Sequence, residues 1–412
     1  MFVMNEEKLK NYAKLIVNSG GNVQKGQLVI VGCDVENARF GRMVAESAYD
    51  AGASEVVMEW GCEFSARSRY LRGADEIFDT FAKWRVDKFK DQNDRGAVYL
   101  HIISANPNLL AGVDPDRIRR FSIASRTALK DHMEIMMSNG LRWCGSAAPS
   151  PEWAKLVFPD LSEDEAMEKL WDYILKGARA DGADPIADWK EHKAGFAGRL
   201  DYLNKKQFKS LRITTGIGTD LTVGLATNHV WVGGGGTAKD GLDFFPNMPT
   251  EEVFTMPDKH RANGRVVASM PLSYQGSLIE GIDITFKDGR AVEHSATKGA
   301  EALGNIMNMD EGAKRLGEVA LVSSSSPIAK MKTLFYNTLF DENASSHLAL
   351  GKAYPKNAKD TDKMSAEEKE KIGMNDSLIH VDFMFGTEDM TVTGISENGE
   401  EIVFFENGEF VY

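Results

Sequence analysis

The sequence from residue 28 to residue 58 is LVIVGCDVENARFGRMVAESAYDAGASEVVM. Residues 28–32 (LVIVG) form a compact apolar run that is typical of a buried strand. A helical pattern follows over residues 36–51, and Gly52 stands where a helix C-cap belongs. The apolar stripe of this helix consists of Phe40, Met43, Val44, Ser47 and Ala48. Residues 55–58 (EVVM) then predict a second strand. Strand, helix and strand at this spacing predict a βαβ unit with a right-handed crossover and a parallel sheet.

The first half of the chain contains further segments that predict strands and helices. Residues 96–103 (GAVYLHII) predict a later strand of the same sheet. Residues 162–165 (SEDE) form a capping box, which predicts a helix with Met167, Leu170, Trp171 and Ile174 on its buried face. We therefore expect residues 1–205 to form an α/β domain with a mainly parallel sheet.

The pattern changes after about residue 204, where short β-like segments separated by glycine begin. They are residues 215–219, 221–224, 230–232, 265–268, 282–286 and 290–293. Residues 287–290 (KDGR) predict a hairpin turn, because Asp-Gly readily adopts positive φ angles. Residues 390–412 are again strand-like, whereas the highly charged residues 355–371 predict an exposed excursion. We expect residues 206–412 to form a second, α+β domain with a largely antiparallel sheet.

Composition narrows the class of protein. The chain has 412 residues, too many for one typical core, and its 42% hydrophobic and 26% charged residues are ordinary for a soluble enzyme. A formal net charge of −13 argues against a nucleic-acid partner, because phosphates require a basic surface. No apolar run approaches the roughly 20 residues that span a membrane. Cys33, Cys62 and Cys144 are odd in number and widely spaced. They favour free thiols and a cytoplasmic location.

Several chemistries are disfavoured by missing motifs. The turn after the first strand, residues 32–36 (GCDVE), lacks the G-x-G-x-x-G fingerprint, and its two carboxylates would repel a pyrophosphate. The glycine run at residues 233–236 is not followed by the Lys-Ser/Thr pair of a phosphate loop, so it predicts a flexible turn. The chain also lacks a serine nucleophile elbow and a plausible Cys-His arrangement. Metal ligands remain as the hydrolytic candidates.

Four segments gather carboxylates and histidines. They are residues 249–254 (PTEEVF), 316–320 (LGEVA), 339–347 (LFDENASSH) and 378–383 (LIHVDF). The last is the strongest local signal, because His380 and Asp382 would project from one face of a strand. An imidazole beside a carboxylate suits zinc, cobalt or manganese. A structural His–Asp hydrogen bond explains the same spacing, so the local pattern leaves both open.

The other three segments are ambiguous when taken alone. A helix that starts near Asp341 would place His347 and Tyr354 two turns apart on one face, where they would be ligands or a packed pair. Glu318 enters an apolar run, where a lone charge is costly, so we expect it to be paired or coordinated. Glu251 and Glu252 suit a metal site, but an exposed helix start or turn after a proline explains them nearly as well.

Taken together, the four segments resemble the thermophilic aminopeptidase family, whose named members are aminopeptidases T, S and II. The matching stretches are residues 247–255 (NMPTEEVFT), 312–321 (GAKRLGEVAL), 337–347 (NTLFDENASSH) and 376–382 (DSLIHVD). Supporting stretches are residues 23–26 (VQKG), 150–154 (SPEWA), 218–225 (GTDLTVGL) and 276–281 (GSLIEG). Order and spacing match over nearly the whole chain.

The resemblance implies a catalytic C-terminal domain that holds two divalent metal ions, with zinc, cobalt or manganese as candidates. Carried over residue by residue, the implied ligands are Glu252, Glu318, His347, Tyr354, His380 and Asp382. Glu342 is a further candidate as ligand or proton carrier, and we expect Glu318 to bridge the ions. Tyr354 is expected to help stabilise the oxyanion. The resemblance also implies a homodimer that releases N-terminal residues from short peptides.

Three other functions stay open at this stage. A different metallohydrolase, such as a dipeptidase, would use the same ligands with a differently shaped pocket. A non-catalytic binding module would hold structural Ca²⁺ or Mg²⁺, but these ions prefer shells made only of oxygen, and the histidines count against them. A nucleotide-binding α/β enzyme is disfavoured by the missing glycine fingerprint.

Overall fold

The computed structural model describes residues 6–104 and 106–412, which form two compact units. The first unit comprises the described residues up to Lys193 together with Gly235–Thr250. The second comprises Ala194–Gly234 and Glu251–Tyr412. Within the described residues, no helix combines the length and the apolar character that crossing a membrane requires.

A four-stranded parallel sheet with strand order β2-β1-β3-β4 is the centre of the first unit. Its strands are β1 (Leu28–Asp34), β2 (Glu55–Gly61), β3 (Val98–Ile103) and β4 (Trp143–Ala147). The helices are α1 (Glu6–Leu15), α2 (Ala38–Asp50), α3 (Glu63–Arg72), α4 (Lys83–Asp94), α5 (Pro115–Ala128), α6 (Lys130–Met137), α7 (Pro151–Val157) and α8 (Glu163–Gly177). The predicted βαβ unit and the capping box of α8 are confirmed.

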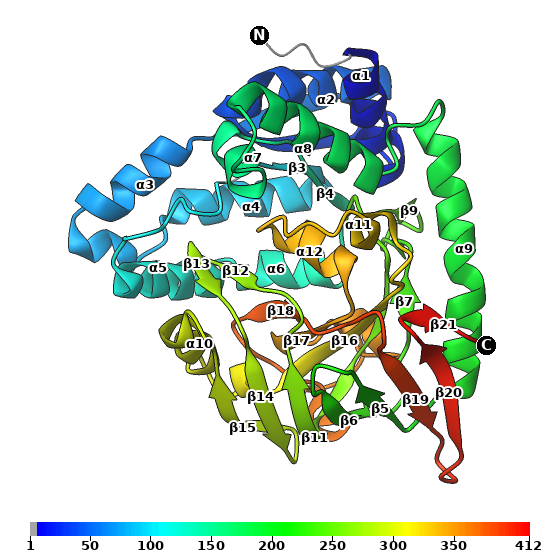
Figure 1. Ribbon diagram of the computed structural model, residues 1–412. Helices are drawn as coiled ribbons and strands as arrows, with labels where there is room; N and C mark the ends of the chain where they lie inside the picture. Colours follow the sequence, from blue (N-terminus) through cyan, green and yellow to red (C-terminus); the bar gives the residue numbers. More distant parts are fainter. Residues whose placement is uncertain (1–5, 105) are drawn as a thin grey trace. The chain divides into compact units, whose positions relative to one another are not determined.

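Helices cover both faces of this sheet, which explains why its central strand β1 is continuously apolar. Leu28 and Ile30 of β1 pack with Phe89 of α4 and Met136 of α6. On the other side, α1, α2 and α8 are joined by ring contacts of Phe40 with a tyrosine of α1 and a tryptophan of α8. Figure 1 shows these three helices across the sheet from α4 and α6.

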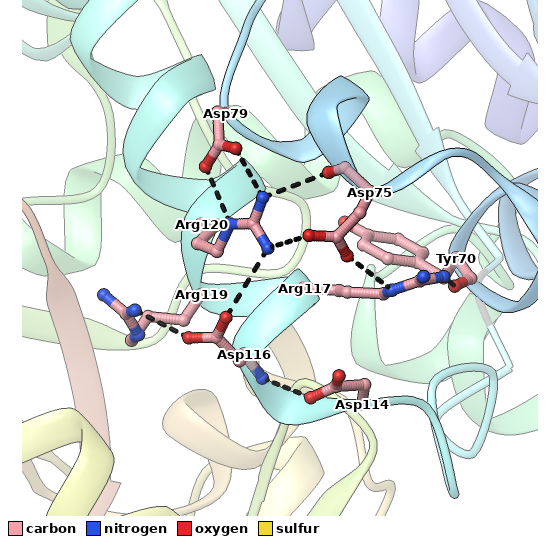
Figure 2. Close-up of polar contacts among 8 residues, drawn as sticks. All are labelled: Tyr70, Asp75, Asp79, Asp114, Asp116, Arg117, Arg119 and Arg120. Carbon is pink, nitrogen blue, oxygen red and sulfur yellow. Dashed lines mark hydrogen bonds and ion pairs between the residues drawn. The ribbon is translucent and has the colours of Figure 1, made fainter.

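An ionic cluster centred on Arg120 fastens α5 to the short turn η3 (Asp75–Phe78). In Figure 2 the guanidinium of Arg120 lies between two carboxylates, donating from Nε to Asp79 and from Nη1 to Asp75, each at 2.7 Å. Arg117 contacts Asp75 at 3.3 Å and donates to the carbonyl oxygen of Tyr70 at 2.8 Å, which ties in the end of α3. The hydrogen-bond partners Asp79 and Asp75 lie 41 and 45 residues from Arg120 along the chain, so local sequence patterns did not predict the cluster.

Two antiparallel sheets build the second unit, as the sequence predicts for an α+β fold. The eight-stranded sheet has the order β15-β14-β11-β6-β5-β19-β20-β21, and the five-stranded sheet has the order β18-β17-β16-β10-β7. The larger sheet contains β5 (Ser210–Thr214), β6 (Asp220–Leu225), β11 (Pro257–Val267), β14 (Asp283–Lys287), β15 (Arg290–Ser295), β19 (Thr391–Ile395), β20 (Glu401–Glu406) and β21 (Glu409–Phe410). The smaller contains β7 (Val232–Gly233), β10 (Glu252–Thr255), β16 (Leu316–Val322), β17 (His347–Gly351) and β18 (His380–Met384).

Short elements complete both units. The second unit also contains α10 (Ala300–Met307), α11 (Pro327–Lys330), α12 (Thr338–Ala344), α13 (Ala366–Lys371), β12 (Leu272–Tyr274) and β13 (Ser277–Ile279). The first unit contains β8 (Gly236–Thr237) and β9 (Asp243–Phe244), and α9 (Pro185–Lys206) includes the point where the chain passes between the units.

Turn predictions in the second unit had mixed outcomes. The Asp288-Gly289 turn between β14 and β15 is confirmed, and both residues have positive φ, 50° and 76°. A Cβ on Gly289 would lie 1.9 Å from the carbonyl oxygen of Lys259, so this position requires glycine. The prediction of a β-like segment at residues 215–219 is wrong, because these residues form the turn that joins β5 to β6. Gly218, at φ 108°, lies within that turn, in a conformation that favours glycine.

One core contains residues of both sheets of the second unit. Along the smaller sheet the apolar residues alternate, and every second residue enters this core. These residues are Val253, Val319, Leu321, Leu348, Leu350, Val381 and Phe383. Burying each such side chain is worth about 1.5–3 kcal/mol, so together they specify the register of the sheet strongly.

His229 is a buried titratable group in the second unit, only 3% exposed. Its Nδ1 donates to the carbonyl oxygen of Ala226 at 3.0 Å, and its Nε2 is buried without a hydrogen-bond partner among the described residues. Burial lowers the pKa of His229 to about 4, from an ordinary value of 6.5. The folded protein therefore holds this imidazole neutral.

We predict that acid destabilises the protein partly through His229. The unfolded chain binds a proton at this residue below about pH 6.5, whereas the folded chain binds it only near pH 4. Stability from this residue is therefore present above pH 6.5 and is lost as the pH falls through this window. Between about pH 7 and about pH 4.5, the free energy of unfolding of His229→Gln should show about 2–2.5 kcal/mol less pH dependence than that of the wild type. Urea unfolding at about pH 7 and about pH 4.5 checks this; an equal pH dependence in both proteins would refute it.

Candidate metal centre

The smaller sheet turns a polar group of side chains away from the core. On β16, Glu318, Ala320 and Val322 alternate with core residues and share one face. Ala320 lies opposite His347 of β17, and Val322 lies opposite Glu252 of β10. Residues directly opposite each other in antiparallel strands project from the same face. Three candidate residues from three strands therefore lie on the face that the core does not use.

Strand β18 extends this face. Ala349 of β17 lies opposite both Glu318 and Asp382, and Gly351 lies opposite His380. The predicted strand that carries His380 and Asp382 is confirmed. Because Ala349 and Gly351 are small, the space above β17 is left to the longer polar side chains on either side.

A β-bulge at Gly317 brings β16 unusually close to the end of β17. Leu316 lies opposite Leu350 and Glu318 opposite Ala349, so Gly317 is an extra residue on β16. A Cβ on Gly317 would lie 2.4 Å from the carbonyl oxygen of Gly351 and 2.5 Å from that of Lys352. Only glycine permits this approach, and the bulge adjoins Glu318.

The polar atoms meet in two groups that share Glu318. Glu252, Glu318 and His347 form one group, and Glu318, His380 and Asp382 form the other; within each, the potential ligand atoms lie within 4.8 Å of one another. His347 Nε2 is 2.9 Å from Glu252 Oε2 and 3.5 Å from Glu318 Oε1. His380 Nε2 is 3.3 Å from Asp382 Oδ1 and 3.8 Å from Glu318 Oε2. The two oxygens of Glu318 thus face different imidazoles.

Backbone carbonyls orient both imidazoles. His347 Nδ1 donates to the carbonyl oxygen of Ser345 at 3.1 Å, and His380 Nδ1 donates to that of Lys352 at 2.7 Å. The Nε2 atoms are therefore the ones that face the carboxylates. A carbonyl partner on the far nitrogen is the usual support for a metal-binding histidine, because it selects the tautomer and the ring orientation.

Burial and mutual repulsion raise the pKa values of two carboxyl groups of the cluster, Glu318 and Glu342. Burial raises the pKa of Glu318 to about 7, with the charges of Glu252 and Asp382 adding to the shift and a hydrogen bond from His347 opposing it. Burial also raises the pKa of Glu342 well above its ordinary value, and Asp382 and Glu252 add to that shift. Without a cation, this cluster must therefore bind protons to limit its negative charge.

The pKa values of the two imidazoles are also raised, which favours their charged form. Burial alone would lower the pKa of His380, but the charges of Asp382 and Glu318 outweigh it and raise the pKa to about 10. Glu252 and Glu318 likewise raise the pKa of His347 despite its burial. Burial opposes ionisation of Asp382, yet His380 and His347 hold its pKa below the ordinary value. The residues already interact as one electrostatic unit.

The chemistry of this donor set fits divalent metal ions. Glu318 Oε2 and Asp382 Oδ1 are buried and receive no hydrogen bond from the described residues. Leaving a buried polar atom unsatisfied costs about 1–3 kcal/mol, and more for a charged one. A cation placed between these oxygens would remove that cost. Mixed imidazole and carboxylate donors suit zinc, cobalt or manganese better than calcium or magnesium.

Glu342 and Tyr354 lie beside the two groups. Glu342 is on α12, where its neighbour Asp341 accepts hydrogen bonds from the backbone of Phe335 at 2.7 Å and of Asn337 at 2.9 Å. The ring of Tyr354 meets His380 edge-on, with centroids 4.8 Å apart. Among the described residues, Glu342 does not contribute an atom to the two compact ligand groups. Both Glu342 and Tyr354 interact electrostatically with Asp382.

The predicted helix that carries both His347 and Tyr354 is wrong. Helix α12 ends at Ala344, Ser345 is extended (φ −154°, ψ 148°), and His347 begins strand β17. The reason is tertiary, because β17 is buried and pairs with strands on both sides, and these ladders outweigh local preference. Tyr354 reaches His380 from the loop after β17.

The predicted exposed excursion at residues 355–371 is wrong at its start. Asn357 and Thr361 are only 2% and 5% exposed, and the ammonium of Lys356 lies over the rings of Phe254 and Tyr354. Burial lowers the pKa of Lys356, while Glu318 and Glu252 oppose that shift. Sequence reasoning missed Lys356, and its place two residues after Tyr354 was the one available signal. Helix α13, at the end of the segment, has no buried residue, as expected.

Comparisons with known proteins agree along the chain. A family model described as thermophilic metalloprotease (M29) matches residues 5–410. Aminopeptidase 2 of Geobacillus stearothermophilus is 42% identical over 407 residues, covering 99% of this chain and 98% of that protein. Aminopeptidase AmpS of Bacillus subtilis (strain 168) is 40% identical over 406 residues, covering 98% and 99%. The solved structure of wild-type AmpT from Thermus thermophilus aligns with a TM-score of 0.91 and 39% identity, covering 99% of this chain and 100% of that one.

We predict that Gly317→Ala damages both the fold and the metal centre. The new methyl group would overlap two carbonyl oxygens, so β16 or β17 must shift and Glu318 and the Lys352 carbonyl must move with it. The free energy of unfolding should fall by about 2–4 kcal/mol, and stoichiometric metal binding should be lost. Urea unfolding and metal analysis of the purified protein measure the two effects.

Gly304→Ala is the matched control, because a Cβ at this helical position meets no atom within 4 Å. It should leave stability equal or slightly higher, since alanine favours helix. If Gly317→Ala behaved like Gly304→Ala, the tight bulge described above would be incorrect.

Proposed function

The chain belongs to the thermophilic metalloprotease (M29) family and is a metallo-aminopeptidase, and we propose that it uses two divalent metal ions to release single N-terminal residues from short peptides. One observation supports the two-ion proposal above the others. Glu318 is shared by two groups of potential ligands, and each of its oxygens faces a different imidazole. A carboxylate in that position can bridge two ions.

Under this proposal the two groups become two metal sites. Glu252, Glu318 and His347 would hold one ion, and Glu318, His380 and Asp382 would hold the other. Tyr354 and Glu342 lie close enough to complete a coordination shell or to act on the substrate. When bound, two such ions lower the pKa of a water molecule and polarise the peptide carbonyl.

Glu342 suits the role of proton carrier. Its carboxyl group is outside the two ligand groups, and burial together with the charges of Asp382 and Glu252 raises its pKa, which makes its carboxylate a stronger base. It would accept the proton of the attacking water and deliver it to the nitrogen of the leaving amine as the C–N bond breaks. The phenol of Tyr354 stays protonated because burial and the nearby carboxylates raise its pKa, so it can donate a hydrogen bond.

We propose that an acidic pocket restricts hydrolysis to N-terminal residues, because it would attract a free α-ammonium group. An internal peptide bond lacks such a group. We therefore expect peptides whose N-terminus is blocked to be poor substrates.

We also propose that the enzyme is cytoplasmic and forms a homodimer. Cys33 and Cys144 are buried free thiols, which suits a reducing compartment. The homodimer rests on the family resemblance of the sequence, and light scattering of the purified protein measures it.

We predict that activity follows metal content. The protein should hydrolyse a leucine anilide as purified, lose activity after chelation, and regain it with zinc, cobalt or manganese as binding approaches two ions per chain. Metal analysis alongside the rate assay checks this. Recovery of full activity at one ion per chain would refute the two-ion mechanism, and a protein that never binds transition metals would refute the aminopeptidase proposal itself.

We predict that Glu342→Gln removes catalysis but leaves the metal in place. The amide keeps the shape of the side chain but cannot carry the proton, so kcat should fall by about 100-fold or more. Metal content and thermal stability should stay near those of the wild type. Glu367→Gln, on the exposed helix α13, is the control and should change nothing. Loss of metal from Glu342→Gln would instead identify Glu342 as a ligand.

A further inference from the structure

Lys356 places an ammonium group against two aromatic rings, one of which, Tyr354, contacts His380 of the metal centre. Its Nζ lies 4.9 Å from the ring centroid of Phe254 and 5.1 Å from that of Tyr354, and the two rings are 6.0 Å apart. Phe254 follows Glu252 by two residues on β10 and shares its face. The ammonium therefore contacts both aromatic rings, which border the ligand groups.

The backbone around Lys356 is firmly held. Lys356 belongs to the short turn η5 (Pro355–Asn357). The Asn357 amide donates to the carbonyl oxygens of Phe254 at 3.1 Å and Val230 at 3.2 Å. Thr361 Oγ1 donates to the carbonyl oxygen of Pro355 at 2.7 Å. These bonds tie the turn to β10, so Lys356 is positioned by the fold.

The ammonium of Lys356 has no hydrogen-bond acceptor in the protein. In the described part of the chain its Nζ contacts the two rings, and no hydrogen bond and no ion pair within 4.0 Å engages it. Its N–H groups are therefore available to a ligand that binds beside the two rings.

We propose that Lys356 is a catalytic residue that donates a hydrogen bond to the carbonyl oxygen of the scissile peptide and stabilises the negative charge that develops there. This inference rests on the proposed aminopeptidase function. A preorganised cation stabilises an oxyanion more strongly than the neutral carbonyl. Lys356 therefore acts mainly on the transition state.

The step conserves atoms and charge. The oxygen of water bonds to the carbonyl carbon, its proton passes to Glu342, and the π electrons of the C=O bond move to the carbonyl oxygen, which accepts the hydrogen bond from Lys356. The C=O bond then re-forms as the C–N bond breaks, and Glu342 returns the proton to the leaving amine. Lys356 keeps its own protons throughout.

The test compares Lys356→Met with Lys356→Arg and with the control Lys359→Met, an exposed lysine three residues away. In Lys356→Met, kcat for a leucine anilide should fall about 100-fold, with metal content and thermal stability unchanged. KM should change by less than about 3-fold. Lys356→Arg should recover part of the loss, and Lys359→Met should match the wild type.

Inhibitor binding distinguishes a catalytic role of Lys356 from a structural one. A phosphinic analogue of a leucyl dipeptide carries a tetrahedral anion, whereas the product leucine does not. Affinity of Lys356→Met for the phosphinic compound should fall in proportion to kcat/KM, and affinity for leucine should stay the same.

Three results would overturn the inference. The first is an unchanged kcat in an active protein. The second is loss of metal in proportion to activity, which would make Lys356 a structural support. The third is a raised KM confined to dipeptides with a free carboxylate, with the anilide and dipeptide amides unaffected, which would assign Lys356 to the substrate C-terminus. A wild-type protein that is inactive with metal restored would refute the proposed function instead.

Discussion

The two-sided character of the five-stranded sheet is the constraint on which the candidate site depends. Alternate residues of β10, β16, β17 and β18 enter the core of the second unit, and the residues between them carry the carboxylates and imidazoles. A slip of one residue in any strand would exchange the faces, burying charge in the core and exposing apolar groups. The free energy of the core therefore holds the polar residues in register.

Holding several carboxylates together out of water is unfavourable, and the structure shows how the cost is limited. The imidazoles of His347 and His380 lie against the carboxylates, and backbone carbonyls fix their orientation. The bulge at Gly317 brings β16 against the carbonyl of Lys352, which in turn orients His380. What remains is a set of buried oxygens without donors, which is stable only with protons or with cations. A bound metal ion would therefore offset the cost of burying these carboxylates.

Local patterns predicted the secondary structure well where a strand or helix follows its own periodicity. The βαβ unit at residues 28–58, the capping box at Ser162, the Asp288-Gly289 turn and the strand that carries His380 and Asp382 are all confirmed. Predictions failed where tertiary contacts outweigh local preference. His347 begins a strand because β16 and β18 pair with that segment, and Lys356 is held inward because Asn357 bonds to β10.

The sequence by itself determined the two-part α/β and α+β fold class, the family, and which residue types are available for catalysis. These follow from periodicity over a few residues and from four motifs in a characteristic order. Only the tertiary structure decided that Glu318 faces both imidazoles, that Glu342 and Tyr354 stand beside the ligand groups, and that Lys356 joins them. The physical reason is the distance along the chain over which each interaction acts. Hydrophobic alternation acts between residues that are neighbours along the chain, whereas charge and hydrogen bonding at this site act between segments that long stretches of sequence separate.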